Sequence, residues 1–328
     1  MKAHVAVCST RRALLAVGAL TMLGVPAYVS AWPDRPVRLV VPFGTGGGTD
    51  IQARLLAEKL RDLSGQTFIV DNRPGAGGMI GAENVINAPA DAHTVLFTTA
   101  TLAINTTLFS KTLKFDPRKE LIPSTLISNA PNVLCLHPTV PAKTVPQLIS
   151  LARKQPGLLN AGVNVPGSTS HLAAEMFSQL AGLKTVVIPY TGGGPAMAAL
   201  MTGDVDLLFA TGPVATSAMK TGRVRCLAVT TAEKNSSLPE LPTMASFVPG
   251  LEIGNWYAMF FKRGTPQAAV DALSGLMKKT LNDKKIRDFY AREGLEPVGS
   301  GPDELRKLFE RDIAKYAKVI QQGKIPLR

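Results

Sequence analysis

Two glycine-rich runs of this chain have the residue types and the surroundings needed to bind a small anion. Residues 44–48 read Gly-Thr-Gly-Gly-Gly and residues 192–194 read Gly-Gly-Gly, and each run lies between an expected strand and an expected helix. The first backbone N–H groups of a helix are unpaired, and together they carry roughly half a positive charge. Glycine has no Cβ that would keep a ligand away from this backbone. The pattern therefore predicts that an anion is held here without Lys or Arg.

Shorter glycine runs at residues 75–78 and 167–170 repeat this pattern less completely. In open α/β sheets, loops of this kind lie at the carboxyl ends of strands, where ligands bind. We therefore expect the two main runs to face each other and to grip one anion from both sides. Glycines that only form tight turns are the alternative interpretation of each single run.

Polar side chains near the ends of expected strands add candidate ligand contacts. Thr98 and Thr99 end one strand, and Thr211 follows another. Their hydroxyl or backbone groups could hydrogen-bond a ligand, although polar residues are also common in loops without a function. Asp50 lies in the first turn of a helix, where it stabilises the helix dipole. It would oppose a bound carboxylate unless a water molecule or an amino group lay between them.

A dinucleotide site is a weaker interpretation of the first glycine run. Gly44 and Gly46 follow a strand, and Asp71 comes at the end of the next strand, as in a nicotinamide fingerprint. However, position 49 is Thr where the third glycine is needed. An exported chain also argues against a nicotinamide enzyme, so we expect no cofactor.

Catalytic and metal sites are not supported by the residue pattern either. Ser168 and His171 could suggest a hydrolase, but the chain has no Gly-x-Ser-x-Gly elbow. Ser168 is better explained as a helix N-cap. His93, His137 and His171 are far apart in the sequence and lack the neighbours typical of a metal site. We therefore assign no catalytic residue, no metal and no enzymatic activity.

Alternating strand and helix patterns position these candidate residues. Runs rich in β-branched and apolar residues indicate strands at residues 37–41, 68–70, 94–99, 133–136, 159–163, 186–190, 207–209 and 226–230. A helix is expected from Ile51 to Leu63, and Gly65 is a suitable end for it. Thr49 with Gln52 fits a capping box at its start. The alternation predicts a parallel sheet with helices on both faces, organised as two α/β blocks.

Residues 1–31 read as a secretory signal peptide. Lys2, Arg11 and Arg12 precede an apolar stretch at residues 13–27, and residues 29–31 read Val-Ser-Ala, which suits a signal peptidase. The export route, Sec or twin-arginine, stays open, and an uncleaved membrane anchor is the alternative. No later segment is apolar enough to span a bilayer. The chain from residue 32 onward is therefore expected to be soluble and periplasmic.

Cys135 and Cys226 are the cysteines that remain after residue 31. Both lie in apolar, strand-like runs. In an oxidising compartment they could form a disulfide if these strands are neighbours. The pattern favours two buried free thiols instead.

The net charge of +12 is only weak evidence about partners. Residues 262–328 hold 15 Lys and Arg against 9 Asp and Glu, and most of that local excess lies on mixed-charge helical segments that are typical of a solvated face. Aromatic residues make up 6% of the chain, which does not favour nucleic-acid binding. We therefore expect a small anionic ligand and no nucleic acid.

Several of the residues above belong to longer motifs that are specific when they occur in this order. These motifs lie at residues 32–37, 41–50, 71–78, 167–172 and 189–196. Through them, and over essentially all of residues 32–328, the chain resembles the Bug-type substrate-binding proteins of tripartite tricarboxylate transporters. It departs from the family pattern at Thr45, where proline or alanine is common, and at residues 91–94, where Asp-Ala-His-Thr replaces Asp-Gly-Tyr-Thr. The first departure could alter a glycine-rich loop, and the second concerns a turn.

The resemblance implies an α/β protein with a two-lobed, type II periplasmic-binding-protein fold and a ligand cleft between the lobes. Residues 32–131 and 231–328 would form lobe 1, residues 132–230 would form lobe 2, and strands would cross between them. The loops at residues 43–48 and 190–193 would pinch a ligand carboxylate, partly through ordered waters. The complete expected ligand-binding set is Phe43, Gly44, Thr45, Gly46, Gly47, Asp50, Thr98, Thr99, Ser168, Tyr190, Thr191, Gly192, Gly193 and Thr211.

The expected function is capture of a small carboxylate, either an organic acid or an acidic amino acid, for a tripartite tricarboxylate transporter. The expected partners are this ligand and the membrane permease subunits, and the protein is expected to be a monomer. A ligand sensor for a membrane receptor is the main alternative, and an exported α/β enzyme is a further one. The sequence does not say which carboxylate is bound.

Overall fold

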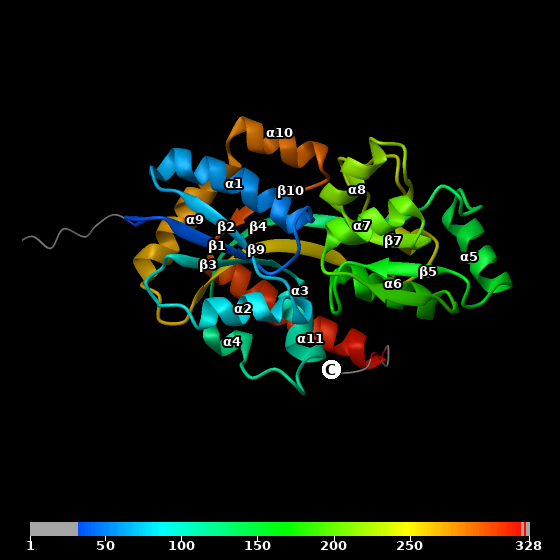
Figure 1. Cartoon of the computed structure of the whole chain (residues 1–328), viewed down its shortest axis with the longest axis horizontal. Coiled ribbons are helices and arrows are strands. Elements are labelled where there is room, and N and C mark those ends of the chain that lie inside the picture. The colour runs from blue at the N-terminus through cyan, green and yellow to red at the C-terminus, as the bar shows by residue number, and fades with distance from the viewer. Residues whose placement is uncertain (1–31, 323–324, 326–328) are drawn as a thin grey trace, which may run out of the picture. The chain divides into compact units, whose positions relative to one another are not determined.

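One mixed β-sheet organises the described part of the chain (Figure 1). The computed structural model describes residues 32–322 and residue 325, and the expected signal peptide at residues 1–31 lies outside the described residues. Residues 32–328 form one compact unit. Within the described residues, no helix has both the length and the apolar character needed to cross a membrane.

The sheet contains ten strands within the described residues, in the order β2-β1-β3-β9-β4-β7-β5-β6, and β8 and β10 also pair with β4. Their bounds are β1 (Val37–Val41), β2 (Phe68–Asn72), β3 (Thr94–Thr99), β4 (Leu121–Leu136), β5 (Asn160–Val163), β6 (Val186–Pro189), β7 (Leu207–Thr211), β8 (Arg225–Val229), β9 (Gly254–Lys262) and β10 (Glu296–Ser300). The sequence predicted most of these strands to within two residues. It missed the first part of β4, β9 and β10.

Strand β4 joins the two halves of the sheet. Its residues 121–131 pair with β9, whereas its residues 132–136 pair with β7 and mostly also with β8. On one side β1 pairs with β2 and β3, and on the other β5 pairs with β6 and β7, all in parallel as predicted. The central pairs β3–β9, β4–β9 and β4–β7 are antiparallel, so the prediction of a parallel sheet was incomplete. Whether two strands pair in a parallel or an antiparallel direction depends on contacts between segments distant in sequence. Local sequence patterns do not encode these contacts.

Helices cover both faces of the sheet, as the alternation of elements predicted. In the half that contains β1, β3 and β9, helices α1 and α9 lie on one face, and α2, α3 and α11 lie on the other (Figure 1). The α-helices are α1 (Gly48–Ser64), α2 (Met79–Ile86), α3 (Thr101–Leu108), α4 (Pro117–Glu120), α5 (Val145–Lys154), α6 (Thr169–Leu180), α7 (Gly193–Thr202), α8 (Gly212–Met219), α9 (Gln267–Leu281), α10 (Lys284–Arg292) and α11 (Pro302–Gln322). Short 3-10 turns occur at Ala76–Gly78 and Met244–Ser246.

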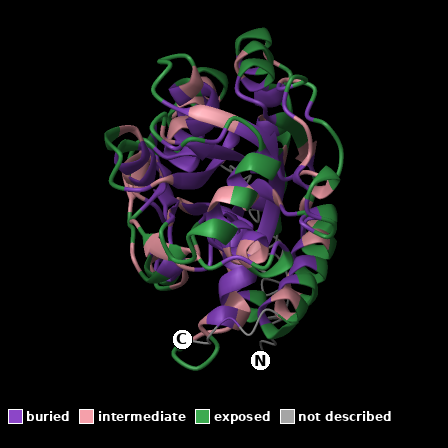
Figure 2. Cartoon of the chain, turned by 90° about the vertical axis from the view of Figure 1, so that its right-hand side faces the viewer, coloured by how far each residue is buried: buried purple, intermediate pink, exposed green. Residues whose placement is uncertain are grey.

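The alternation of side chains along the strands explains why both faces of the sheet are apolar. Leu39 of β1 packs in the same cluster as Leu56 of α1, whereas its neighbour Val40 packs with Val85 of α2. Successive side chains of a strand point to opposite faces, so a strand covered on both faces must be apolar throughout. Figure 2 shows the buried residues concentrated in the strands and on the inward sides of the helices.

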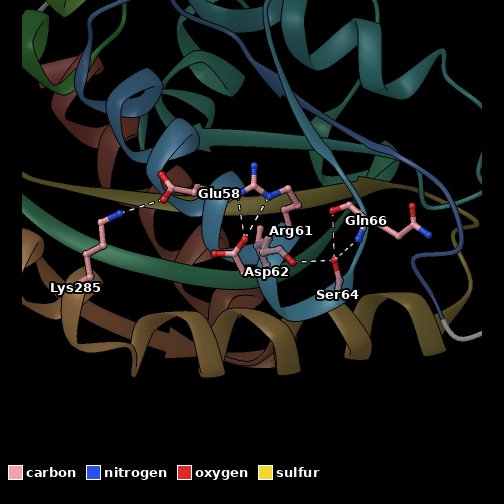
Figure 3. Close-up of polar contacts among 7 residues, drawn as sticks. Glu58, Arg61, Asp62, Ser64, Gln66 and Lys285 are labelled. Atoms are coloured by element: carbon pink, nitrogen blue, oxygen red, sulfur yellow. Dashed lines mark hydrogen bonds and ion pairs between the residues drawn. The ribbon is translucent and has the colours of Figure 1, made fainter.

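Helix α1 ends where the sequence predicted. Gly65 adopts the left-handed conformation with φ of 74°, and its backbone N–H donates to the carbonyl oxygen of Arg61. Nearby, the ammonium group of Lys285 lies 3.1 Å from the carboxylate of Glu58 and links α10 to α1 (Figure 3). These contacts fix the carboxyl-terminal half of α1, which is the helix that begins at the first glycine-rich run.

The expectation of two free thiols was wrong. Cys135 of β4 and Cys226 of β8 are register partners in an antiparallel pair, and they form a disulfide. The two cysteines are 91 residues apart in the sequence. Local patterns place each cysteine in a strand, but only the tertiary structure makes those strands neighbours.

Candidate ligand-binding site

The glycine-rich run after β1 contacts the glycine-rich run after β6, so residues from the two halves of the sheet meet here. The backbone N–H of Gly44 donates a hydrogen bond of 3.1 Å to the carbonyl oxygen of Thr191. A Cβ placed on Gly194 would lie only 2.6 Å from the carbonyl oxygen of Thr45. Glycine is needed at such a close approach because a side chain would collide with backbone atoms. The two runs therefore face each other, as the sequence predicted.

Next to this contact lies a cavity that residues from both halves of the sheet enclose. Its volume is about 30 Å³, which is room for about two water molecules. The lining residues are Phe43, Gly47, Gly48, Thr49, Thr99, Thr101, Asn164, Val165, Ser168, Thr169, Gly192, Gly193, Thr211, Asn255 and Tyr257. These lining residues include no Lys, Arg, His, Asp or Glu, so their side chains bring no formal charge at neutral pH.

Five helices begin at this cavity. The lining contains the N-cap or first residue of each helix, namely Gly47 and Gly48 for α1, Thr101 for α3, Ser168 and Thr169 for α6, Gly192 and Gly193 for α7, and Thr211 for α8. Each N-terminus carries roughly half a positive charge on its unpaired N–H groups. Their convergence makes the cavity electropositive without any cationic side chain, which is the condition for holding an anion.

The N-cap residues differ in whether their side chains pair with the first backbone N–H groups of their helices. Gly47 and Gly192 make no side-chain hydrogen bond to their helices, so the first N–H groups of α1 and α7 remain available. Ser168 accepts a hydrogen bond of 3.1 Å from the backbone N–H of His171, which confirms its predicted role as an N-cap. The two glycine caps are therefore better suited to a ligand than the serine cap.

The predicted capping box at the start of α1 was wrong. Thr49 lies inside the helix, which begins at Gly48. The side chain of Gln52 donates to the carbonyl oxygen of Gly48 at 3.4 Å and makes no capping contact with Thr49. The last glycine of the run, Gly48, is the first residue of the helix, so Gly47 is the N-cap. The spacing of Thr49 and Gln52 therefore does not form a capping box.

Asp50 lies close to the cavity but not in its lining. Its carboxylate accepts hydrogen bonds from the N–H of Gly46 at 3.0 Å and from the guanidinium of Arg54 at 2.9 Å. Burial alone would raise the pKa of Asp50, but the hydrogen bonds from Arg54 and Gly46 outweigh it and hold this pKa below its usual value of 3.8. The carboxylate is therefore ionised, compensated by Arg54, and used to fix the first glycine-rich loop.

The residues of the predicted ligand-binding set fall into two groups. Those in the cavity lining are Phe43, Gly47, Thr99, Ser168, Gly192, Gly193 and Thr211. Those outside it are Gly44, Thr45, Gly46, Asp50, Thr98, Tyr190 and Thr191. Most of the second group lie in the two glycine-rich loops, where their backbone atoms bring the loops together.

Thr98 and Tyr190 have other places in the structure. Thr98 is buried in β3 opposite Ala258 of β9, and because side chains alternate along a strand, Thr99 reaches the cavity while Thr98 does not. Tyr190 donates its backbone N–H to the carbonyl oxygen of Val163 at 3.0 Å, and its ring packs against an apolar cluster. Neither side chain lines the cavity.

Three buried polar residues of the lining, Asn164, Asn255 and Tyr257, were missed by the sequence reasoning. Asn164 directly follows β5. The criterion that identified Thr211, a polar residue at the end of an expected strand, would also have identified Asn164. Asn255 and Tyr257 lie within the apolar strand β9, where a tyrosine is normally assigned to the core. The other lining residues outside the predicted set are Gly48, Thr49, Thr101, Val165 and Thr169.

The hydroxyl group of Tyr257 is a neutral donor in this cavity. The side chain is fully buried, and burial raises the pKa of Tyr257 to about 12. The side chains of Thr211, Asn255 and Gln52 lie near enough to lower this pKa partly. None of them has the geometry of a hydrogen bond with the hydroxyl oxygen. The phenol is therefore protonated at neutral pH and keeps its hydrogen-bonding capacity for the cavity.

Fold and site together define the class of this protein. It is a two-lobed α/β protein of the periplasmic-binding-protein type, with its ligand cleft between the lobes. A sequence model described as the tripartite tricarboxylate transporter family receptor matches residues 52–325. The chain belongs to this family of solute-binding receptors, and it is of the Bug type.

Individual relatives agree with this assignment. BugT of Bordetella pertussis is 32% identical over 304 residues, which cover 91% of this chain and 93% of BugT. A structure of an R. palustris protein with adipate has 36% identity and a TM-score of 0.87, covering 90% of this chain and 99% of the other. MatC from Rhodopseudomonas palustris, solved with bound malate, has 28% identity and a TM-score of 0.83, covering 88% and 99%.

Proposed function

We propose that the protein captures a small carboxylate, an organic acid or an acidic amino acid, in this cavity for delivery to a transporter. The observation that carries the proposal is the convergence of five helix N-termini on a cavity lined by no acidic side chain. Such a site favours an anion over a neutral molecule of the same shape. The two similar structures with adipate and malate bound support the carboxylate class.

Ligand entry requires the two lobes to separate. A cavity of about 30 Å³ is too small for an organic acid of several carbon atoms. The hydrogen bond between Gly44 and Thr191 closes the same region. We propose that this contact is lost when the cleft opens, so that a solute enters between the glycine-rich loops and the lobes then close on it.

We propose that residues 32–131 with 231–328 form lobe 1 and that residues 132–230 form lobe 2. The proposal is supported by the change of partner along β4, where Pro131 pairs with β9 and Asn132 pairs with β7. It is further supported by the hydrogen bond of 2.9 Å from the N–H of Thr230 to the carbonyl oxygen of Asn132. The two proposed boundaries therefore meet at one place, which suits a hinge.

We propose that the bound solute is released unchanged. In support, the hydroxyl oxygen of Ser168 accepts from the backbone N–H of His171 and does not meet its imidazole. Atom Nδ1 of that imidazole instead accepts a hydrogen bond of 3.1 Å from the N–H of Gly167. The imidazole of His171 is thus not positioned to activate this candidate nucleophile.

The cellular setting forms part of the same proposal. We propose that residues 1–31 direct export to the periplasm and that the protein acts there as a monomer with the membrane permease subunits of a tripartite tricarboxylate transporter. The sequence features of residues 1–31 and the family of the chain support this setting. Capture of the permease subunits by the ligand-loaded protein, in membranes that contain them, tests the partner assignment.

Calorimetric titration tests the ligand class directly. The purified protein is titrated with small mono- and dicarboxylates and, as matched controls, with the corresponding neutral amides. We expect at least one carboxylate to bind with micromolar or better affinity and its amide to bind at least about tenfold more weakly, because the helix N-termini favour negative charge. Equal binding of acids and amides, or binding of neither, would contradict the proposal.

A further inference from the structure

Four buried polar side chains around the cavity have hydrogen-bonding atoms without a partner among the described residues. They are Oδ1 of Asn164, Oγ1 of Thr211, Oδ1 of Asn255 and the hydroxyl group of Tyr257. All four residues line the cavity, and none is more than 8% exposed. Buried polar groups are nearly always paired in native proteins, and four of the nine unpartnered (orphan) side-chain atoms among the described residues gather at this one cavity, where a ligand can complete them.

The positions of these atoms place them at the cavity wall. A Cβ added to Gly48, which lines the cavity, would lie 2.5 Å from the hydroxyl oxygen of Tyr257 and 2.9 Å from Oγ1 of Thr211. A Cβ added to Gly193, on the opposite lobe, would lie 3.6 Å from both amide atoms of Asn164. The orphan groups thus lie beside the same glycines that open the helix N-termini to the ligand.

The chemistry of these groups differs from that of the helix N-termini. Backbone N–H groups only donate, and a carboxylate satisfies them because it only accepts. The amide oxygens of Asn164 and Asn255 accept, so a carboxylate cannot satisfy either of them. The hydroxyl group of Tyr257 lies beside Asn255 and can donate to that amide oxygen, whereas the oxygen of Asn164 needs a ligand that also carries a hydrogen-bond donor.

A hydroxyl group fits this requirement better than an ammonium group. The lining contains no Asp or Glu that would compensate a buried positive charge. The carboxylate of Asp50, in the first turn of α1, is already paired with Arg54 and Gly46. A hydroxyl donates to an amide oxygen without bringing charge, and it can accept from the hydroxyl groups of Thr211 and Tyr257.

We propose that the ligand is a hydroxylated carboxylate, whose carboxylate binds the helix N-termini and whose hydroxyl group is selected by Asn164, Asn255, Thr211 and Tyr257. This inference rests on the proposed function, since it concerns the same cavity. It narrows the ligand class by excluding unsubstituted acids and amino acids as the preferred ligands. A site built to hydrogen-bond a hydroxyl discriminates strongly against the analogue that lacks it, because its own buried groups then stay unpaired.

Matched ligand series test the inference at each chain length. Titrations compare propionate, lactate and alanine, then succinate, malate and aspartate, then glutarate, 2-hydroxyglutarate and glutamate. Within the series that binds best, we expect the hydroxy acid to bind at least about tenfold more tightly than the unsubstituted acid and the amino acid. Comparison within one length removes the effect of ligand size.

Two substitutions connect the selectivity to the orphan groups. Asn164→Leu removes the amide at similar volume, and Tyr257→Phe removes only the hydroxyl. We expect each to lower the affinity ratio of hydroxy acid to unsubstituted acid, toward about one for Asn164→Leu. The matched control is Asn84→Leu, because Oδ1 of Asn84 on α2 is also buried and unpartnered but Asn84 does not line the cavity. It should leave the ratio unchanged, and circular dichroism checks the folding of every variant.

The outcomes separate this inference from the proposed function. Tight binding of an unsubstituted acid or an amino acid in preference to the hydroxy acid would overturn the inference while leaving carboxylate capture intact. The affinity ratio of hydroxy acid to unsubstituted acid could also stay unchanged in the correctly folded Asn164→Leu and Tyr257→Phe variants. That result would overturn the proposal that these residues select the hydroxyl group. Failure of all acids to bind more tightly than their amides would instead contradict the proposed function itself.

Discussion

The backbone N–H of Gly44 donates to the carbonyl oxygen of Thr191, and this single hydrogen bond of 3.1 Å joins the two glycine-rich loops. Gly44 precedes α1 and Thr191 precedes α7, so the bond also brings two helix N-termini to the same cavity. Neither residue lines that cavity. We propose that this contact closes the cleft, so changes close to it should alter ligand binding more than folding.

Gly192→Val should weaken ligand binding far more than it weakens folding. Gly192 has φ of 168°, an extended conformation that valine also adopts, so the backbone itself is not strained. A Cβ at this position would lie 3.0 Å from the backbone N of Gly44, which prevents the loops from approaching. We expect at least about a tenfold loss of affinity by calorimetry, with a small shift in melting temperature.

Gly275→Val is the matched control for this substitution. A Cβ on Gly275 of α9 would meet no atom within 4 Å outside its own helix, so the same side chain is added without a collision. Its ligand affinity should equal that of the unmodified protein. Equal losses of binding and of folding stability in Gly192→Val would contradict the assignment of this loop to the pocket.

Gly48→Ala should destabilise the protein by a collision that Tyr257→Phe relieves. The added methyl group would lie 2.5 Å from the hydroxyl oxygen of Tyr257, although alanine is otherwise favoured in a helix over glycine by about 1 kcal/mol. In the Tyr257→Phe background that oxygen is absent, so the cost of Gly48→Ala should fall. Urea unfolding of the four proteins of this double-mutant cycle measures the coupling, which we expect to be about 1 kcal/mol or more. Additive effects would show that the two groups do not meet.

The alkaline stability of the protein should depend on Tyr257. Burial raises its pKa from 10.0 to about 12 in the folded state, so folding favours the protonated phenol. This contribution is complete below about pH 10 and is lost as the pH rises towards about 12. Between these values, the free energy of unfolding of Tyr257→Phe should fall less steeply with pH, by up to about 1.4 kcal/mol per pH unit. Denaturant titrations at several pH values measure this dependence. An equal fall of the free energy of unfolding with pH in both proteins would count against a buried, neutral Tyr257.

Replacing the disulfide by Cys135→Ala with Cys226→Ala should destabilise the fold and spare the ligand site. The bond closes a loop with a sequence separation of 91, and loops of that length correspond to roughly 4 to 5 kcal/mol of stabilisation. Neither cysteine lines the cavity, so affinity should change less than about twofold in a folded sample. Urea unfolding and calorimetry measure the two effects. Detection of two free thiols in the unreduced, denatured exported protein would refute the bond.

Much of the site could be predicted from local sequence because its main groups are backbone amides. Gly47, Gly192 and Gly193 are recognisable as glycines between a strand and a helix, and that local pattern determines where N–H groups are unpaired. Ser168 as an N-cap and Gly65 as a helix end follow equally from local chemistry. These features need no knowledge of distant residues.

The sequence by itself therefore determined most strands, the glycine-rich segments from which α1 and α7 begin, and the anionic character of the ligand. Only the tertiary structure decided which side chains reach the cavity, because this depends on how β4 and β9 carry residues between the halves of the sheet. Tyr257 has the local pattern of a core residue, yet it lines the cavity. Cys135 and Cys226 have the local pattern of isolated thiols, yet the pairing of β4 with β8 brings them together in a disulfide. Pairing between residues distant in sequence is set by packing of the whole fold, which local periodicity does not encode.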